Sequence, residues 1–429
     1  MPAPVIDAMP ARRILLIVAI GVTAWFDVRA ADKPDLWVLR GAKVYVAPDT
    51  PPIEDGIVLV RGDRIAAVGP RASVSIPAGA RESECSGRVV AAGFQNSHVH
   101  FTEDQWNDAR GQPAEALSRR LAAMLTRYGY TTVFDLASDR DNTLALRARI
   151  DSGEVRGPRI LTAGLPLFPP NGIPVYLAHF PPRLLAKFPQ PATVAAGVDR
   201  VRENLDAGAD ATKLFVATPQ GNGAVRRMPA EFARAAADAS HRRGKMVMAH
   251  PTDIDGVRSA LAAGVDVLAH TTLGVETPWP DTLRRQVIDA GMAVMPTLKL
   301  MGHELGKERV PEAIAQRLVA ASVEHVRAFA SAGGEVIFGT DAGYMTDYDP
   351  AEEYVLLSKA GLAPMQILAS LTTTPAARWK EGGRRGRLAP GMDADIVVLD
   401  ADPAAHPANF AKVRCTIRRG TAIYTAPGK

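Results

Sequence analysis

The 429-residue sequence predicts an α/β protein, a (β/α)8 TIM barrel joined to a small β-sandwich domain that both flanks of the chain build. Two observations indicate this architecture. In the middle of the chain, an alanine-rich amphipathic stretch repeatedly ends at a glycine, and a short apolar segment follows. Toward both ends, apolar and polar residues alternate between turn residues, which is typical of strands with one buried face.

The repeated unit of the middle region is interpreted as a helix followed by a strand. A glycine stands where each helix would end in a positive-φ residue, at Gly129, Gly208, Gly244, Gly264, Gly291 and Gly333. Short, continuously apolar strands are expected when both faces of a parallel sheet are covered. With the segments before "NSHVH" and at "PRILTAG", eight strands can be counted. A doubly wound sheet is the alternative, but no glycine-rich phosphate turn follows the first strand.

The flanks are predicted to form one domain that the barrel interrupts. The segments 34–90 and 384–429 are assigned to the β-sandwich, and residues 91–383 to the barrel. Cys85 and Cys415 both fall in the sandwich, where they form either one disulfide or two separate buried thiols.

The first 30 residues are interpreted as a secretory signal peptide. Arg12 and Arg13 precede an apolar run from Ile14 to about Phe26, and small residues occupy the cleavage positions at Val28 and Ala30. This run is shorter than the roughly 20 residues of a comfortable membrane span. We therefore expect a secreted or periplasmic protein with no stable membrane span after cleavage, an uncleaved anchor being the alternative.

Composition narrows the class of partner. Hydrophobic residues make up 47% of the chain and charged residues 22%, values typical of a soluble enzyme. The net charge is only +4, and no dense basic run is interleaved with aromatic residues, so we expect no nucleic-acid partner. A small-molecule substrate is expected instead, and a homo-oligomer is left open.

Histidines gather at the ends of the predicted strands. His98 and His100 end the first strand, and residues two apart in a strand point to the same side. Four of the nine histidines fall at strand ends. Because strand ends of a barrel converge on one mouth, the sequence predicts a metal site there. The strand-end residues are His98, His100, Lys213, His250, His270 and Asp341.

These motifs resemble those of the amidohydrolase superfamily, close to its imidazolonepropionase-like and prolidase-like secreted branch. The resemblance covers nearly everything after the leader and includes the C-terminal phrase "GRLAPGMDADIVVLD". It is specific for the superfamily but not for a substrate. The chain departs from many relatives at Asn96, where they have aspartate two residues before the first histidine.

The resemblance implies two divalent ions, with zinc favoured. His98, His100 and Asp341 would hold one ion, and His250 and His270 the other. Lys213 would bridge both ions after reacting with CO2, because an ammonium group cannot ligate a cation. The alternatives are an ordinary lysine paired with Asp210, or a mononuclear site.

The expected activity is metal-dependent hydrolysis of an amide or peptide bond in a small molecule such as a dipeptide, N-acyl amino acid or cyclic amide. A hydroxide bridging the metals would attack the carbonyl, and Asp341 would pass its proton to the leaving nitrogen. A lactonase or esterase is the nearest alternative. A metal-dependent isomerase or decarboxylase, and a non-catalytic exported binding protein, are further alternatives.

Selectivity is expected from the loops that follow the strands, including the segment Leu165 to Pro191. An arginine there could fork onto a substrate carboxylate, although a surface arginine is the plainer interpretation. The candidate substrate-binding residues are Tyr176, His179, Arg226, Arg227, His303 and Tyr344.

Overall fold

A computed structural model describes residues 1, 36–178, 180, 182–272 and 278–427. The predicted signal peptide, residues 1–30, lies outside the described residues except for Met1. In the part of the chain that the structure describes, no helix is long and apolar enough to cross a membrane. The division into domains at residues 90 and 384 stays a prediction.

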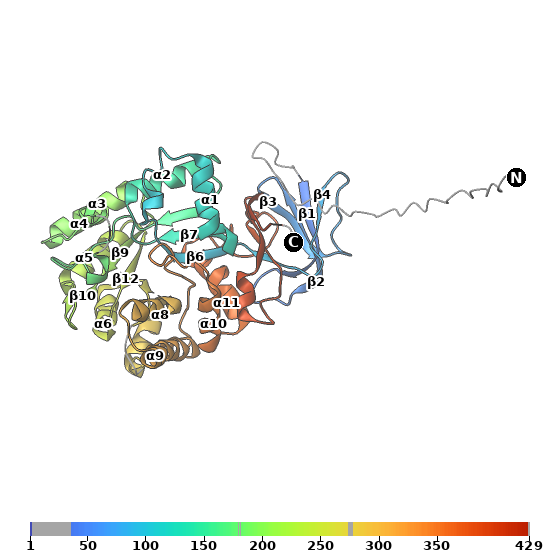
Figure 1. Cartoon of the computed structure of the whole chain (residues 1–429). Helices are drawn as coiled ribbons and strands as arrows, with labels where there is room; N and C mark the ends of the chain where they lie inside the picture. Colours follow the sequence, from blue (N-terminus) through green and yellow to red (C-terminus); the bar gives the residue numbers. More distant parts are fainter. Residues whose placement is uncertain (2–35, 179, 181, 273–277, 428–429) are drawn as a thin grey trace.

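Parallel strands form the centre of the middle region, with helices around them (Figure 1). One sheet has the order β6-β7-β8 and the other β14-β13-β12-β9. The strands are β6 (Phe94–Val99), β7 (Tyr130–Asp135), β8 (Arg159–Thr162), β9 (Ala211–Phe215), β12 (Met246–His250), β13 (Val267–Ala269) and β14 (Ala293–Met295). A two-stranded hairpin, β10 (Ala217–Pro219) and β11 (Val225–Arg227), follows β9.

Backbone hydrogen bonds connect the two parallel sheets on both sides. Between β8 and β9, the amide of Asp210 donates to Thr162, and Leu167 pairs with Leu214. On the other side, the segment 336–341 pairs with β14 at Val336 and with β6 through the bond from Asp341 N to His98 O. This segment, the predicted eighth strand, forms isolated bridges rather than a regular strand.

Gly339 lets the segment 336–341 approach β6 closely. A Cβ at this position would lie 2.8 Å from the Cβ of His98 and 2.8 Å from the side chain of Met295. Because real Cβ atoms do not come so near a neighbour, only glycine fits here without a shift. The close approach delivers Asp341 next to His98.

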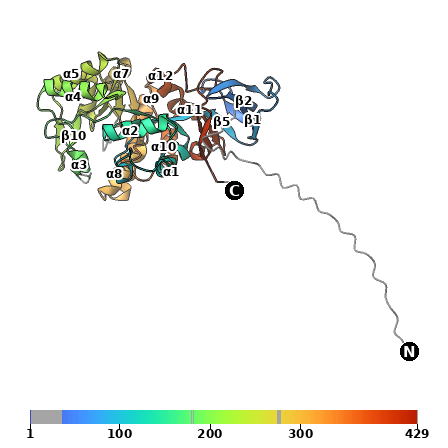
Figure 2. The same ribbon diagram turned by 90° about the horizontal axis from the view of Figure 1, so that it is seen from above.

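The helices pack outside the strands and bury a common apolar core with them (Figure 2). Alternate strand residues such as Leu214, Val247 and Leu268 face this core. The longer helices are α1 (Ala114–Met124), α2 (Arg140–Asp151), α4 (Val194–Asp206), α5 (Ala230–His241), α6 (Ile254–Ala263), α7 (Asp281–Asp289), α8 (Leu298–Lys307), α9 (Glu312–Ser331), α10 (Ala351–Lys359) and α11 (Pro364–Leu371). The shorter ones are α3 (Pro182–Leu185) and α12 (Thr373–Arg378).

The opposite faces of the parallel strands enclose a second, inner apolar cluster. It contains Ala211, Met248 and Ala269. Lys213 and His250 lie two residues beyond Ala211 and Met248, so the strand alternation turns both side chains to the same inner side. The inner apolar cluster therefore lies beneath the polar residues at the strand ends.

The two flanks of the chain meet in one eight-stranded sheet at the other end of the molecule (Figure 1). Its order is β17-β16-β15-β5-β1-β2-β3, with β4 beside β1. The strands are β1 (Leu36–Tyr45), β2 (Ile53–Arg61), β3 (Arg64–Pro70), β4 (Arg81–Glu84), β5 (Val89–Ala92), β15 (Ile396–Leu399), β16 (Val413–Arg418) and β17 (Thr421–Thr425). Strands of both flanks thus share one sheet, as the sequence indicates, while a two-layered sandwich stays a prediction.

This sheet contacts the barrel core through β5 and β15. Val89 and Val397 pack in the same cluster as the barrel helices, whereas their neighbours Val90 and Val398 face a core of the sheet itself. Cys85 and Cys415 are free thiols in that core, and burial raises their pKa to about 12 and about 11. Two buried, unreactive thiols are therefore the arrangement found.

A buried carboxylate on α10 caps α8. Glu353 Oε2 accepts a hydrogen bond of 2.7 Å from the backbone N–H of Lys299, in the first turn of α8. A negative charge is favourable at a helix N-terminus. Burial nevertheless raises the pKa of Glu353 from 4.5 to about 7, because desolvation outweighs that hydrogen bond.

We expect Glu353→Gln to flatten the pH dependence of stability. The folded wild type binds the extra proton between pH 4.5 and about 7, so its free energy of unfolding falls across this range as pH rises. One pKa unit corresponds to about 1.4 kcal/mol, so the free energy of unfolding falls by at most roughly 3 kcal/mol over this range. Urea unfolding from pH 4 to pH 8 measures it, with the exposed Glu352→Gln as control. Parallel pH profiles for Glu353→Gln and wild type would contradict this expectation.

Candidate metal centre

All six predicted ligands line one cavity of about 490 Å³ at the carboxyl ends of the parallel strands. His98 lies in β6, Lys213 in β9 and His250 at the end of β12. His100 and His270 follow β6 and β13, and Asp341 is the last residue of the segment 336–341. Each of the six is at most 9% exposed. The cavity is of the size that small-molecule sites occupy.

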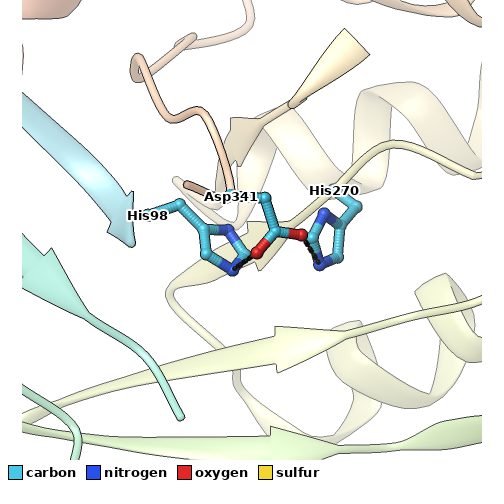
Figure 3. A group of neighbouring side chains, drawn as sticks. All are labelled: His98, His270 and Asp341. Carbon is cyan, nitrogen blue, oxygen red and sulfur yellow. Dashed lines mark ion pairs between the residues drawn. The ribbon is translucent and has the colours of Figure 1, made fainter. Parts of the chain in front are cut away.

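Asp341 lies between His98 and His270 (Figure 3). Its Oδ1 is 2.6 Å from His100 Nε2 and 3.4 Å from His98 Nε2, and its Oδ2 is 3.9 Å from His270 Nε2. Ligand atoms of His98, His270 and Asp341 all lie within 4.8 Å of one another. Asp341 Oδ1 is buried, and its close contacts with His98 and His100 lack hydrogen-bond geometry, so a cation there would satisfy it.

The rings of the histidines form a continuous row. Ring centroids are 4.6 Å apart for His98 and His270, and 4.8 Å apart for His270 and His250. His250 also stacks on Phe215 with a centroid distance of 4.9 Å, which fixes the plane of its ring. The row brings the two predicted metal positions side by side.

Two of the ligands sit on a strained backbone. His270 has a φ of 81° and Asp341 a φ of 62°, in the left-handed region that non-glycine residues rarely adopt. Such conformations cost on the order of 1–3 kcal/mol and concentrate at functional sites. The turns aim both side chains into the cavity instead of along the strands.

Burial favours the neutral form of three of the histidines. It lowers the pKa of His98, His250 and His270 well below the usual value, and the charges of neighbouring groups such as Lys213 lower it further. A neutral imidazole has the free lone pair that a metal requires. The donor set of neutral histidines around a carboxylate therefore fits a divalent ion such as zinc.

Lys213 is buried without an ion pair among the described residues, and the charge of Asp341 only partly offsets the cost of its burial. Lys213 is 1% exposed and forms no ion pair or hydrogen bond with a described residue, and its Nζ lies 5.5 Å from the centroid of Phe215. The alternative partner Asp210 is instead bound by Arg147 at 2.8 Å. Burial lowers the pKa of Lys213 to about 7, so much of the amine is neutral near physiological pH. A neutral amine is the form that reacts with CO2.

The sequence did not predict Thr297, which orients His270. Thr297 Oγ1 lies 2.7 Å from His270 Nδ1 and donates to the carbonyl of Pro296 at 2.8 Å. Since its proton is engaged, the hydroxyl accepts from Nδ1–H, and the lone pair of His270 is then on Nε2. Thr297 has a φ of 47° at the start of α8, a turn that spacing alone does not reveal.

We expect Thr297→Val to weaken zinc binding about 10- to 100-fold, the usual cost of losing a group that orients a metal ligand. The substitution keeps the shape of the side chain but removes the acceptor for His270. Competition with a chromogenic chelator measures the affinity. Thr297→Ser retains the hydroxyl and should bind zinc like the wild type, whereas equal affinity in Thr297→Val would contradict the role.

Asn96 holds the backbone that carries two ligands. Its Nδ2 donates to Thr340 Oγ1 at 2.7 Å, and its Oδ1 accepts from the amides of His98 and Thr340, both at 3.2 Å. The side chain thereby connects His98 to the residue before Asp341. Because no hydrogen bond joins Asn96 to a ligand side chain among the described residues, its action is on the backbone.

The candidate substrate-binding residues separate into three groups. Tyr176 and Tyr344 line the cavity. Arg226, Arg227 and His303 are not among its described lining residues, and Arg227 is held by both oxygens of Asp253 at 3.0 and 2.7 Å. His179 lies outside the described residues. The predicted segment Leu165 to Pro191 contributes aromatic residues to the lining, whereas the sequence did not predict the contribution of helices α8 and α9.

Comparison with known proteins agrees with this geometry. A profile of the amidohydrolase family matches residues 89–423. The chain belongs to the amidohydrolase family. Its fold is therefore TIM-barrel-like, and this membership supports the prediction of a hydrolase acting on carbon–nitrogen bonds.

Three proteins that this chain resembles are between 21 and 30% identical to it over the matched residues. A putative prolidase from Bifidobacterium longum is 26% identical and has a TM-score of 0.75 over 92% of this chain and 96% of that one. An imidazolonepropionase of Thermoplasma acidophilum is 21% identical over 87% of this chain and 90% of its own length. An uncharacterized protein of Mycobacterium tuberculosis is 30% identical, but the match spans only 44% of this chain and 50% of that protein.

Proposed function

We propose that this amidohydrolase uses two divalent ions to hydrolyse an amide bond in a small molecule, the ions being held as the sequence predicts. The observation that carries the proposal is the convergence of six buried strand-end residues on one cavity, with Asp341 in contact with His100. The neutral histidines and the unpaired Lys213 support it, because both are ready to become metal ligands.

The residues have distinct roles in this proposal. His98, His100 and Asp341 would hold one ion, His250 and His270 the second, and carboxylated Lys213 both. Two such ions supply a hydroxide near neutral pH and polarise a carbonyl oxygen. Asp341 accepts the proton released from water and transfers it to the nitrogen, while the C–N bond breaks and a C–O bond forms. The products are a carboxylate and an amine.

The proposal extends to export of the mature chain, for which the basic pair and apolar run of residues 1–30 are the support. The N-terminus of the purified protein from the periplasmic fraction tests it. A mature protein that begins near residue 31 is expected.

The function is tested by metal analysis combined with hydrolysis assays. We expect about two zinc ions per chain, release of amine from at least one small amide in a set of dipeptides, N-acyl amino acids and anilides, loss of this activity with a chelator, and its return with zinc. Lactones and aryl esters are the comparison substrates. A kcat/KM for these that exceeds every amide would favour the lactonase alternative, and a metal-free active protein would contradict the proposal.

A further inference from the structure

We infer that the substrate is an uncharged amide with an aromatic or similarly bulky apolar group, and not a free dipeptide or N-acyl amino acid that carries a carboxylate. This inference rests on the proposed function and names its substrate class. It derives from the walls of the cavity rather than from the metal centre.

One wall of the cavity is aromatic. Phe168 stacks on Phe215 with a centroid distance of 4.3 Å and lies 5.4 Å from Phe188. Tyr344 contacts Tyr176 and Phe180 at centroid distances of 5.9 and 6.2 Å. The rings belong to one apolar cluster that adjoins His250 through Phe215. An aryl group beside the scissile bond would therefore meet ring faces and edges.

A second group of lining residues is aliphatic. Leu300 and Leu305 come from α8 and Leu318 from α9, and Val310 lies between these helices. Leu300 and Leu305 are buried, and Leu318 is partly exposed. Together the aromatic and aliphatic residues offer apolar contact to a flat group.

The charged groups that line the outer cavity are acidic. They are Asp253, Glu304 and Glu308, whereas Lys213 at the metal centre is the one lysine or arginine among the described lining residues. Two nearby cations are already engaged. Arg227 binds Asp253, and Lys307 Nζ donates to Tyr344 Oη at 2.7 Å and contacts Glu304 at 3.2 Å. The undescribed internal positions 179, 181 and 273–277 add no lysine or arginine to the sequence.

A substrate carboxylate would therefore leave water without gaining a cationic partner away from the metals. Burying an unpaired charge is costly. An uncharged aryl or alkyl group gains roughly 25 cal/mol for each Å² of apolar surface that it buries. Both effects favour the neutral compound.

A matched pair of 4-nitroanilides tests the inference in the zinc-loaded wild-type protein. Butyryl-4-nitroanilide and succinyl-4-nitroanilide share the scissile bond and leaving group and differ in a terminal methyl or carboxylate. We expect kcat/KM for release of 4-nitroaniline to be at least about 30-fold higher for the butyryl compound, given the cost of an unpaired charge. Equal rates, or faster cleavage of the succinyl compound, would overturn the inference.

A binding experiment distinguishes a failure of this inference from a failure of the proposed function. Ketone analogues of both anilides, in which CH2 replaces the scissile N–H, are not hydrolysed and can be titrated calorimetrically. Tighter binding of the uncharged ketone supports the inference even if neither anilide is cleaved, an outcome that would count against the proposed hydrolysis alone. Equal or tighter binding of the carboxylate ketone would overturn the inference.

A cation introduced at the cavity edge should reverse part of the selectivity. Leu318→Arg places a guanidinium where the wall is partly exposed, so the variant is expected to fold. We expect the butyryl-to-succinyl ratio of kcat/KM to fall at least about 10-fold, as one charge-assisted pair allows. Leu318→Gln is the uncharged control. An unchanged ratio in Leu318→Arg would show that charge does not set the selectivity.

Discussion

Asp341→Asn is expected to lower kcat for amide hydrolysis by about 10³-fold or more, within the range attributed to general acid–base catalysis and above it if an ion is lost. Asparagine keeps the size of the side chain but cannot accept a proton. It also removes the charge that His100 and His98 contact at 2.6 and 3.4 Å. Initial rates at saturating substrate and excess zinc measure the effect.

The matched control for this substitution is Asp347→Asn. Asp347 lies six residues further along the chain, and its side chain is 69% exposed and paired with Lys299. We expect this variant to retain the activity of the wild type. If Asp341→Asn also retained that activity, Asp341 would not be the proton carrier.

Lys213→Ala is expected to reduce bound zinc from two ions to at most one per chain and kcat at least about 100-fold. The reason is the loss of the ligand that would serve both ions. Acetate should restore part of the activity, since a small carboxylate fits the space of the removed side chain. In the wild type, ¹³C-labelled bicarbonate should give a carbamate resonance in the NMR spectrum that is absent from Lys213→Ala.

Lys187→Ala controls for the loss of a lysine, because Lys187 has a side chain that is 50% exposed and pairs with Asp139. It should keep two ions and full activity. Full metal content in Lys213→Ala, together with no carbamate resonance in the wild type, would mean that Lys213 is an ordinary buried lysine.

The six predicted ligands could be grouped from the sequence because strand ends carry a local signal, and the structure brings them to one cavity. A histidine or lysine directly after an apolar run can be assigned to one face by alternation, as for Lys213 and His250. The eighth strand was found from its apolar residues, but its irregular form depends on the approach of Gly339 to His98. The pairing of the flanks into one sheet was likewise readable from their alternating pattern.

The residues around the ligands could not be predicted in the same way. Thr297 reaches His270 because the chain turns through a positive φ, and Asn96 reaches Thr340 across 244 residues. The sequence made Arg227 a candidate for binding a substrate carboxylate, but its guanidinium pairs with Asp253, which lies in the loop after β12. Such contacts depend on tertiary packing of loops, which periodicity does not encode.

Anomalous X-ray scattering at the zinc edge, from crystals of the zinc-loaded protein, would show how many ions the cavity holds. We expect two peaks about 3.5–4 Å apart, the usual separation of paired metals. One should lie beside His98, His100 and Asp341, and the other beside His250 and His270, with density joining Lys213 to both. No peak in the cavity, or a single peak at full zinc loading, would contradict the two-ion proposal.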